Sequence, residues 1–465
     1  MCGVFGIYAP ERDVARLAPF GLLALQHRGQ ESAGIAVSDD GHLMVVRDMG
    51  LVAQVFTEAT LSGLTGQAAI GHTRYSTTGA TMWTNAQPSV QHGNGRAVAL
   101  GHNGNLTNTT ALRDELRRDG ARLTSTSDTE AIAALVARDQ GTLEEAVARA
   151  MARLDGAYAI VLLSEGKLVG FRDPDGIRPL ALGRLDGDFV LASESCVFDL
   201  LGAEFVREVA PGEIVVADGD GLRSIQALPP QGRTALCVFE LIYFARPDSR
   251  LAGVELHAAR VRMGERLAEE APADADVVIP IPDSGTPAAT GFARASGIPF
   301  SEGLIKNRYV GRTFIQPDQA LREHGIKTKF NPLDELAGKR VVVVDDSIVR
   351  GTTTRKIVGM LFEAGATEVH VRISSPPVVS PCYYGIDMAT TEELVAASRS
   401  EEEIRALLGA TSLAYLSLDG LEWATRQPAE ELCRACLTRQ YPTRLPEHGG
   451  LAKLRFEARK PAPVR

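Results

Sequence analysis

The sequence lacks any apolar run long enough to cross a membrane. A transmembrane helix needs about 20 consecutive apolar residues, and no stretch of the 465-residue chain approaches that length. The N-terminus also lacks the basic region and the long apolar core of a secretory signal. From these two absences we expect no membrane partner and a cytoplasmic protein.

Positive charge and cysteine are also limited. Asp and Glu outnumber Lys and Arg by 58 to 49, which gives a net charge of −9. Domains that bind nucleic acid usually present a basic face, so this balance argues against nucleic acid as the main partner. The six cysteines of a long chain without a signal point to a reducing compartment, where thiols react or bind metal.

Two common nucleotide-binding motifs are missing. The chain contains no Gly-x-x-x-x-Gly-Lys-Ser/Thr loop, and no dinucleotide glycine fingerprint follows a strand. Internal repeats and low-complexity segments are absent as well. The chemistry must therefore be carried by other motifs of an ordinary globular chain, whose length suggests two or three domains.

The two halves of the chain differ in texture. Up to about Leu228, many short strand-like runs such as Val4–Tyr8 alternate with glycine turns, which predicts two packed, mostly antiparallel sheets with helices outside. Pro229–Gly232 resembles a linker. After it, strands and helices alternate, which predicts a doubly wound parallel sheet. We expect domains over residues 2–228 and 233–445, followed by a basic tail over residues 446–465.

The segment Val341–Thr353 is the most informative one. Four valines suit a strand buried on both faces of a parallel sheet, and the strand ends in Asp345 and Asp346. A turn through Gly351 then opens an apolar-periodic helix, whose free N–H groups can hold a phosphate. Two carboxylates beside such a turn suit the vicinal hydroxyls of a sugar or a metal, so the segment predicts a site for a phosphorylated ribose. The turn supplies Ser347, Arg350, Gly351, Thr352 and Thr353.

Two further segments carry groups that suit anions. Ile279–Thr286 leaves a second buried strand into a polar turn with Asp283 and Ser284; a plain strand-to-helix turn is an equally good interpretation of this segment alone. Lys306–Phe314 adds cations and aromatics, including Lys306, Arg308 and Arg312, and a solvated basic loop is the alternative. In an acidic protein, such a cation cluster favours a polyanionic ligand.

These three segments resemble the type I phosphoribosyltransferase family. The resemblance implies that the acidic pair holds the ribose hydroxyls of phosphoribosyl diphosphate (PRPP), that the turn after it holds the 5′-phosphate, and that the Ser284 loop holds the diphosphate. It also implies that the basic loop closes over PRPP. Mg²⁺ would arrive with the diphosphate, with Ser284, Asp345 and Asp346 as candidate ligands.

The N-terminus offers a nucleophile. If Met1 is removed, as the small Cys2 side chain favours, Cys2 carries a thiol beside a free α-amine that can act as its base. A chance cysteine remains the alternative for this residue alone. The surrounding motifs are Gln26–Gly29, Gly71–Thr77, Gly101–Leu106 and Ser125–Glu130.

Together these motifs resemble the N-terminal-nucleophile glutamine amidotransferases, over nearly the whole first half. The resemblance implies an αββα sandwich with Cys2 as nucleophile. Arg74 would pair with the α-carboxylate of glutamine and Asp128 with its α-ammonium. Asn103 and the N–H of Gly104 would form the oxyanion hole. We expect His27, His72 and His102 to be structural.

The remaining cysteines offer a metal site. Cys433 and Cys436 form a Cys-x-x-Cys pair, and Cys237 and Cys382 are available outside the first half. A redox dithiol, a Zn²⁺ site and an iron–sulfur cluster all suit this set. The Bacillus-like branch of the glutamine PRPP amidotransferases carries a [4Fe–4S] cluster on four cysteines placed this way, and the resemblance favours that cluster. Members of that branch often begin with a short propeptide, whereas here Met1 alone precedes Cys2. Cys196 should be buried and structural.

The whole chain resembles the glutamine PRPP amidotransferase family, which makes 5-phosphoribosylamine for purine synthesis. The resemblance implies glutamine and PRPP as substrates, purine nucleotides as feedback inhibitors and a homotetramer. It also implies that ammonia passes between two sites along Phe239 and Tyr243, whereas an ordinary amphipathic helix is the alternative for that segment. A non-catalytic PRPP sensor would need an added DNA-binding domain, and amidotransferases with other acceptors lack the Val341–Thr353 motif.

Overall fold

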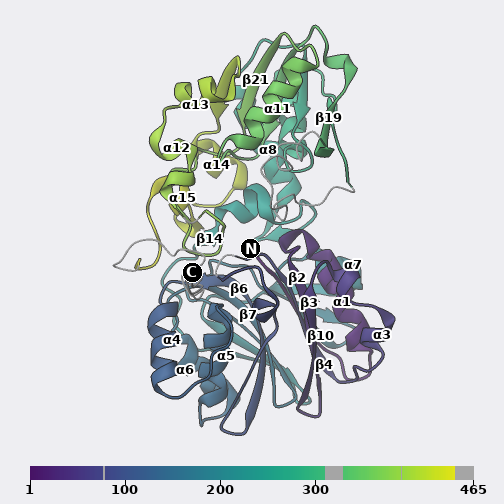
Figure 1. Ribbon diagram of the computed structural model, residues 1–465, viewed down its shortest axis with the longest axis vertical. Coiled ribbons are helices and arrows are strands. Elements are labelled where there is room, and N and C mark those ends of the chain that lie inside the picture. Colours follow the sequence, from purple (N-terminus) through teal and green to yellow (C-terminus); the bar gives the residue numbers. More distant parts are fainter. Residues whose placement is uncertain (77–78, 309–327, 389, 446–465) are drawn as a thin grey trace, which may run out of the picture.

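Two antiparallel sheets pack face to face in the first half of the chain (Figure 1). The structure is a computed structural model that describes residues 1–76, 79–308, 328–388 and 390–445. Between the sheets lies an apolar layer that includes Val4, Ile70 and Val161. The sheets have the orders β11(Glu204–Glu208)–β9(Ala181–Leu185)–β10(Asp188–Ala192)–β1(Gly3–Tyr8)–β4(Ala68–Arg74)–β2(Ser32–Asp39)–β3(His42–Met49) and β13(Gly221–Gln226)–β12(Glu213–Asp218)–β8(Lys167–Arg172)–β7(Gly156–Ser164)–β6(Arg96–Leu106)–β5(Ser89–Gly93).

Helices cover the outer faces of both sheets (Figure 1). A capping box starts the helix over Leu143–Met151: the Thr142 hydroxyl oxygen accepts the Glu145 N–H, and the Glu145 carboxylate accepts the Thr142 N–H. The predicted αββα layering is therefore confirmed. The helical elements of this half are α1(Val14–Ala24), η1(Gln26–Arg28), α2(Val52–Val55), α3(Glu58–Leu61), η2(Trp83–Asn85), α4(Thr109–Arg118), α5(Asp128–Arg138), α6(Leu143–Met151) and α7(Cys196–Leu201).

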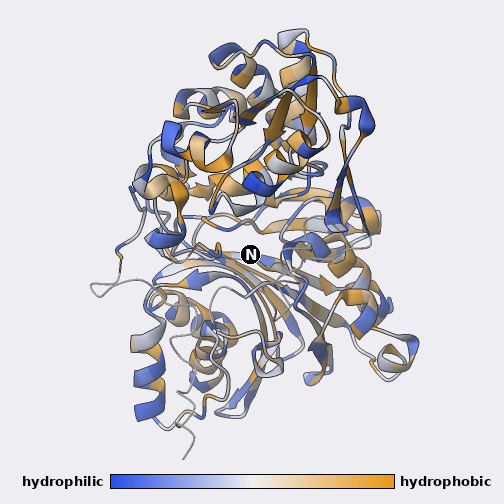
Figure 2. Cartoon of the chain, turned by 45° about the horizontal axis from the view of Figure 1, so that its top comes forward, coloured by the Kyte–Doolittle hydropathy of each residue, from blue (hydrophilic) through white to orange (hydrophobic). Residues whose placement is uncertain are grey.

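A four-stranded parallel sheet forms the centre of the second half. Its order is β17(Val277–Pro280)–β20(Arg340–Asp345)–β21(Glu368–Ile373)–β22(Ser412–Tyr415). The Val341–Val344 run is buried on both faces, and hydrophobic strands lie inside the layer of helices (Figure 2). The helices of this half are η3(Glu240–Phe244), α8(Leu256–Glu270), α9(Thr286–Ser296), η5(Asp334–Leu336), α11(Thr352–Glu363), η6(Thr391–Glu393), α12(Val395–Ser398), α13(Glu401–Leu408), α14(Leu418–Thr425), η7(Ala429–Glu431) and α15(Ala435–Thr438).

Small two-stranded pairings complete the second half. β14(Leu236–Cys237) pairs in parallel with β23(Leu432–Cys433), which ties the end of the described chain to the start of this half. The other two pairs are β15(Arg250–Leu251) with β16(Val254–Glu255) and β18(Leu304–Lys306) with β19(Phe330–Pro332). Pro229–Gly232 is an exposed loop between the halves.

The segment after Cys237 differs from the alternative of an ordinary amphipathic helix. Val238 and Phe239 are α-helical and run into a short π-helix over Glu240–Phe244. The helical run ends there because the Ala245 backbone is extended and Pro247 follows within one turn. The N-terminus lies where the two halves meet (Figure 1). In the described ranges, no helix combines the length and the apolar character that a membrane crossing requires.

Candidate active sites

A pocket of about 720 Å³ opens at the carboxyl ends of β17 and β20. Such strand ends are where open α/β sheets bind ligands. The pocket brings together the residues predicted from three separate segments of the sequence. They are Asp283, Ser284, Lys306, Arg308, Asp345, Asp346, Ser347, Arg350, Gly351, Thr352 and Thr353, and Tyr243 joins them. Arg312 lies outside the described residues.

The acidic pair is buried and repels itself. Burial raises the pKa of Asp345 well above its ordinary value, and the neighbouring Asp346 raises it further. Burial also raises the pKa of Asp346, although hydrogen bonds from Ser284 and Ser347 oppose that change. A cation or a set of hydroxyl donors would relieve this repulsion. The carboxylate and hydroxyl oxygens are the donor type that Mg²⁺ takes, so the residues fit the ion.

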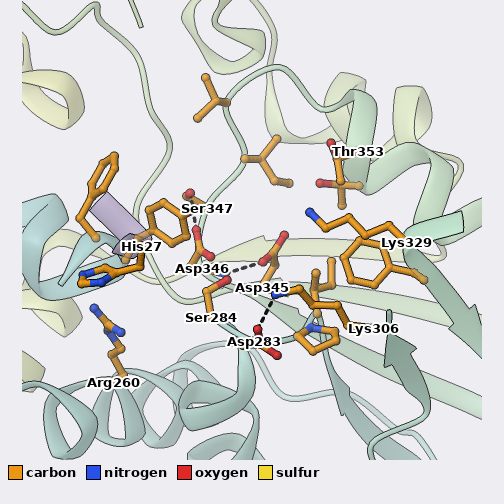
Figure 3. Close-up of a pocket in the computed structure, with 18 of the residues that line it drawn as sticks. His27, Arg260, Asp283, Ser284, Lys306, Lys329, Asp345, Asp346, Ser347 and Thr353 are labelled. Carbon is orange, nitrogen blue, oxygen red and sulfur yellow. Dashed lines mark hydrogen bonds and ion pairs between the residues drawn. The ribbon is translucent and has the colours of Figure 1, made fainter. Parts of the chain in front are cut away.

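The turn after the acidic pair presents backbone donors. Gly351 has a φ of 74°, a left-handed conformation that a glycine adopts at little cost, and the helix α11 begins directly after it. The N-cap residue Gly351 makes no side-chain capping bond, so in the described part of the chain the first N–H groups of α11 are left as an anion site at the pocket. Arg350 pairs with Glu393. Lys306 pairs with the neighbouring Asp283 in the pocket (Figure 3).

Residues outside the predicted set also line the pocket, among them His27, Arg260 and Lys329. His27 comes from the first half of the chain, Arg260 from α8, and Lys329 from the position just before β19 (Figure 3). Lys329 lies over the Phe330 ring at 5.3 Å. The cation-rich segment around Lys329 was a usable signal for that residue. Nothing local signals His27 or Arg260, because each reaches the pocket from a distant element.

Cys2 directly precedes β1, and the N-terminus lies where the first half of the chain meets the second (Figure 1). Its backbone N–H donates to Asn103 Oδ1 at 3.2 Å, and its thiol lies 3.5 Å from the Tyr75 carbonyl oxygen. The Arg28 Nε donates to the Cys2 carbonyl at 2.9 Å. Met1 is buried against Arg178. Removal of Met1 would expose the Cys2 α-amine to the space that Met1 occupies.

The proposed oxyanion donors lie beside Cys2 on β6. Asn103 is fully buried, and its Oδ1 accepts the Cys2 N–H. Its Nδ2 is a buried donor that has no hydrogen-bond partner among the described residues. Gly104 has a φ of 149°, and a Cβ there would lie 2.0 Å from the Ala157 carbonyl oxygen. An unpaired buried donor costs free energy, so a ligand oxygen is the partner this geometry lacks.

The predicted glutamine-binding side chains surround the same end of the sandwich. Arg74 ends β4, and its guanidinium approaches Glu31 at 3.4 Å. Asp128 accepts the Leu106 N–H at 3.1 Å and lies 3.5 Å from His102 Nδ1. Burial alone would lower the pKa of His102, but Asp128 raises it above its ordinary value. Burial lowers the pKa of His72 to about 3, so His72 is neutral.

Four of the six cysteines gather at the junction. Cys237 and Cys433 are partners in the β14–β23 pairing. Burial raises the pKa of Cys436, and the nearby thiols of Cys237, Cys382 and Cys433 raise it further. Burial also raises the pKa of Cys433 above its ordinary value. All four are free thiols, and the Tyr384 N–H donates to Cys382 Sγ at 3.4 Å. Within residues 1–445, apart from the three undescribed gaps, no group of three His, Cys, Asp or Glu side chains is arranged to hold a single metal ion.

The donor set nevertheless suits an iron–sulfur cluster, whose ligands are cysteine thiolates. A dry shell around the thiols is present, since Leu236, Val238 and Leu437 are buried beside them. Cys196 is buried elsewhere, and burial raises its pKa to about 12. Phe239 is buried in the same apolar cluster, whereas Tyr243 reaches the pocket.

Each half of the chain matches a known domain family. A glutamine amidotransferase domain family matches residues 72–199, and a phosphoribosyl transferase domain family matches residues 255–374. The amidophosphoribosyltransferase of Synechococcus elongatus is 53% identical over 98% of this chain and 94% of its own. That of Bacillus subtilis is 47% identical over 96% of this chain and 94% of its own. A solved glutamine PRPP amidotransferase from Bacillus subtilis, complexed with ADP and GMP, superposes with a TM-score of 0.90 at 46% identity, covering 96% of this chain and 98% of the other.

Proposed function

We infer from these sequence identities and this superposition that the chain belongs to the amidophosphoribosyltransferase family. It is an enzyme that transfers the amide nitrogen of glutamine to PRPP in purine biosynthesis. Glutamine, PRPP and water give 5-phosphoribosylamine, glutamate and diphosphate. The observation that carries this function is one chain with a Cys2 site in the first half and a ribose-phosphate pocket in the second.

For glutamine hydrolysis we propose Cys2 as the nucleophile and its freed α-amine as the base. The thiol attacks the side-chain amide, ammonia leaves, and water hydrolyses the thioester. The unpaired Asn103 Nδ2 and the Gly104 N–H are the proposed donors to the oxyanion, and such a donor is worth roughly 3 kcal/mol. Arg74 and Asp128 are the proposed partners of the α-carboxylate and the α-ammonium.

For the acceptor reaction we propose that Asp345 and Asp346 bind the ribose hydroxyls. The turn from Ser347 to Thr353 binds the 5′-phosphate, since its donors face the pocket without caps. Asp283, Ser284, Lys306 and Arg308 line the side where diphosphate leaves the anomeric carbon. Arg312 is proposed on the family resemblance alone.

Ammonia must reach the anomeric carbon unprotonated, so we propose a dry passage past Phe239 and Tyr243. Phe239 is buried in the junction and Tyr243 lines the acceptor pocket. The two residues lie one helical turn apart on the segment that joins the sites, which supports this path.

Two metal groups belong to the proposal. Mg²⁺, when bound by Ser284, Asp345 and Asp346, would neutralise charge on the departing diphosphate. A [4Fe–4S] cluster on Cys237, Cys382, Cys433 and Cys436 would hold β23 and α15 to β14 without taking part in the reaction. The free thiols and their apolar surroundings support the cluster.

Regulation, assembly and location are proposed on the same premise. Purine nucleotides are the proposed feedback inhibitors, supported by the ADP and GMP in the Bacillus subtilis enzyme. A homotetramer and a cytoplasmic location follow the family resemblance. The proposed domains are residues 2–228 and 233–445, supported by the exposed loop over Pro229–Gly232 between the two halves.

Cys2→Ser tests the two-site reaction. We expect glutamine-dependent diphosphate release from PRPP to vanish while synthesis with a high ammonia concentration persists, because the acceptor pocket contains no atom of Cys2. Diphosphate release with each nitrogen donor is the measurement. Equal loss of both activities would reject separate sites.

A further inference from the structure

One buried amide side chain joins the two segments that carry the proposed partners of glutamine, Arg74 and Asp128. Asn85 is 1% exposed. Its Nδ2 donates to the Ala80 carbonyl oxygen at 2.9 Å and to the Thr126 hydroxyl oxygen at 2.8 Å. Its Oδ1 accepts the Thr126 N–H at 2.9 Å. Ala80 follows β4 and Thr126 precedes α5, so Asn85 fixes the separation of two segments that are distant in sequence.

The Ala80 end of this link holds the guanidinium of Arg74. Arg74 Nη1 donates to the same Ala80 carbonyl oxygen at 3.2 Å and lies 3.4 Å from Glu31 Oε2. Glu31 in turn accepts the Ser76 N–H and the Thr81 hydroxyl, each at 3.1 Å. Arg74 is buried, so these neighbours set the direction of its guanidinium. A shift of Ala80 would therefore turn the group that is proposed to meet the α-carboxylate of glutamine.

The Thr126 end of the link leads directly to Asp128. Asp128 is the first residue of α5 and is buried. Arg113 holds the backbone on both sides of Thr126, because it donates to the carbonyl oxygens of Ser125 at 2.6 Å and of Ser127 at 2.7 Å. Closely packed interiors transmit strain. A displacement of Thr126 is therefore passed on to Asp128, the proposed partner of the α-ammonium.

The two segments also touch directly beside the Asn85 amide. Gly79 has a φ of 78°, and a Cβ there would lie 2.7 Å from Thr126 Oγ1 and 2.8 Å from Asn85 Nδ2. Both distances are shorter than a nonbonded contact allows, so the backbone approaches this closely only with a glycine at position 79. The hydrogen bonds of Asn85 and the packing of Gly79 therefore specify the same separation of the two segments.

We propose that Asn85 is a positioning residue that sets the separation of Arg74 and Asp128 and thereby makes the site selective for an α-amino acid. The carboxylate and the ammonium of glutamine are attached to one carbon atom, so their two partners must stand at one separation to bind both. Asn85 acts only through Ala80 and Thr126. Both ion pairs persist from binding to the attack on the amide, so misaligning them weakens binding more than it slows the chemical step. This inference deepens the proposed glutaminase function and rests on it.

The test measures ammonia release by the full-length enzyme from glutamine and from glutaramic acid, which is glutamine without its α-amino group. Hydrolysis of the amide gives glutamate or glutarate, so one assay serves both substrates. In Asn85→Ala we expect the KM for glutamine to rise about 30-fold and kcat to stay within about 3-fold, because misaligned ion pairs lose binding energy. The preference for glutamine over glutaramic acid, as a ratio of kcat/KM values, should fall about 10-fold, since the ammonium then gains less from Asp128.

Two comparisons separate this role from a role in folding alone. Gln226→Ala, on the outermost strand β13, removes an amide that also bonds two carbonyl oxygens, those of Pro211 and Leu228, and should keep the native KM and preference. Thr126→Val removes the hydroxyl that Asn85 Nδ2 binds, and should change both quantities in the same direction as Asn85→Ala. A role in folding alone would lower the melting temperature and reduce kcat/KM for both substrates equally.

Each outcome decides the proposal. An unchanged KM in Asn85→Ala, or an equal loss for glutamine and glutaramic acid, would overturn it. If Asn85→Ala fails to fold, Thr126→Val decides, because Thr126 is partly exposed. Asp128→Asn separates this inference from the proposed function. A native KM for glutamine in that variant would reject the proposed glutamine site, whereas a raised KM there beside a native KM in Asn85→Ala would reject the role of Asn85 alone.

Discussion

At the scale of single residues, Asp345 and Asp346 lower the stability of the fold at neutral pH but are the proposed ribose-binding groups. Burial and mutual repulsion raise the pKa of Asp345, so its ionised form is disfavoured in the folded protein. Without a bound metal, the neutral Asp345 carboxyl therefore leaves the stability of the fold intact below its unfolded-state pKa of about 4. That stability falls as pH rises through the higher pKa that Asp345 has in the folded protein. The proposed role in ribose binding requires a carboxylate at Asp345, whereas a neutral side chain there would make the ligand-free fold more stable.

Asp345→Asn should separate these two effects. In chelator at pH 7, we expect the melting temperature to rise by about 2 °C or more, because one buried charge is removed. At pH 4 the gain should shrink. Ammonia-dependent turnover of PRPP should fall about 100-fold or more. Calorimetry and diphosphate release are the measurements, and Asp334→Asn, at an exposed aspartate of the same half, is the control. A lower melting temperature at pH 7 would contradict the electrostatic argument.

Asn103 offers a second prediction at this scale. Asn103→Asp keeps the size of the side chain but replaces the unpaired Nδ2 donor with an oxygen. Glutamine hydrolysis should lose roughly 100- to 1000-fold in kcat, with a smaller change in KM, because the donor acts mainly on the developing oxyanion. Steady-state glutaminase kinetics test this. An unchanged kcat would remove Asn103 from the oxyanion hole.

At the scale of elements, the sequence predicts a strand, turn or helix correctly where the pattern that specifies it lies within the same segment. The Val341–Thr353 strand, turn and helix could be interpreted because each residue type meets a need of its own segment: valines the buried strand, Gly351 the left-handed turn, and aspartates the strand end. Neither His27 nor Arg260 could be assigned this way. Their roles arise from contacts between elements far apart in sequence, and no local pattern encodes such contacts.

The loop after Cys382 shows such a contact between halves of the chain. Asn105 Nδ2 donates to the Tyr383 carbonyl at 2.9 Å. Gly385 has a φ of 108°, and a Cβ there would lie 2.9 Å from the Gly104 carbonyl oxygen. The backbone of the second half thus supports the proposed oxyanion donors of the first.

Gly385→Ala should therefore impair glutamine use more than ammonia use. We expect the ratio of glutamine-dependent to ammonia-dependent synthesis to fall about 10-fold, since a small displacement of a catalytic donor is costly. Gly409→Ala provides the control: its φ of 71° imposes the same kind of backbone strain, but a Cβ there meets nothing within 4 Å. Similar ratios in the two variants would attribute any loss to strain alone.

At the scale of the whole molecule, the cysteine group closes the second half onto itself. The β14–β23 pairing joins Leu236–Cys237 to Leu432–Cys433 through only two residue pairs. So short a pairing is weak by itself. The neighbouring Cys382 also begins the loop that reaches Gly104. The thiols therefore lie where β23, the rest of the second half and the proposed glutaminase site meet.

Cys436→Ser tests whether a cluster holds this junction. The protein purified without oxygen should contain about four irons per chain, and the variant should lose most of them. The segment after Thr425 should then be cut faster by a protease, because β23 and α15 lose their attachment to β14. Iron and sulfide analysis with limited proteolysis are the measurements. Cys196→Ser, at the buried thiol outside the group, should keep its iron. Stoichiometric zinc in the native protein, with no visible iron–sulfur absorbance, would replace the cluster with a Zn²⁺ site.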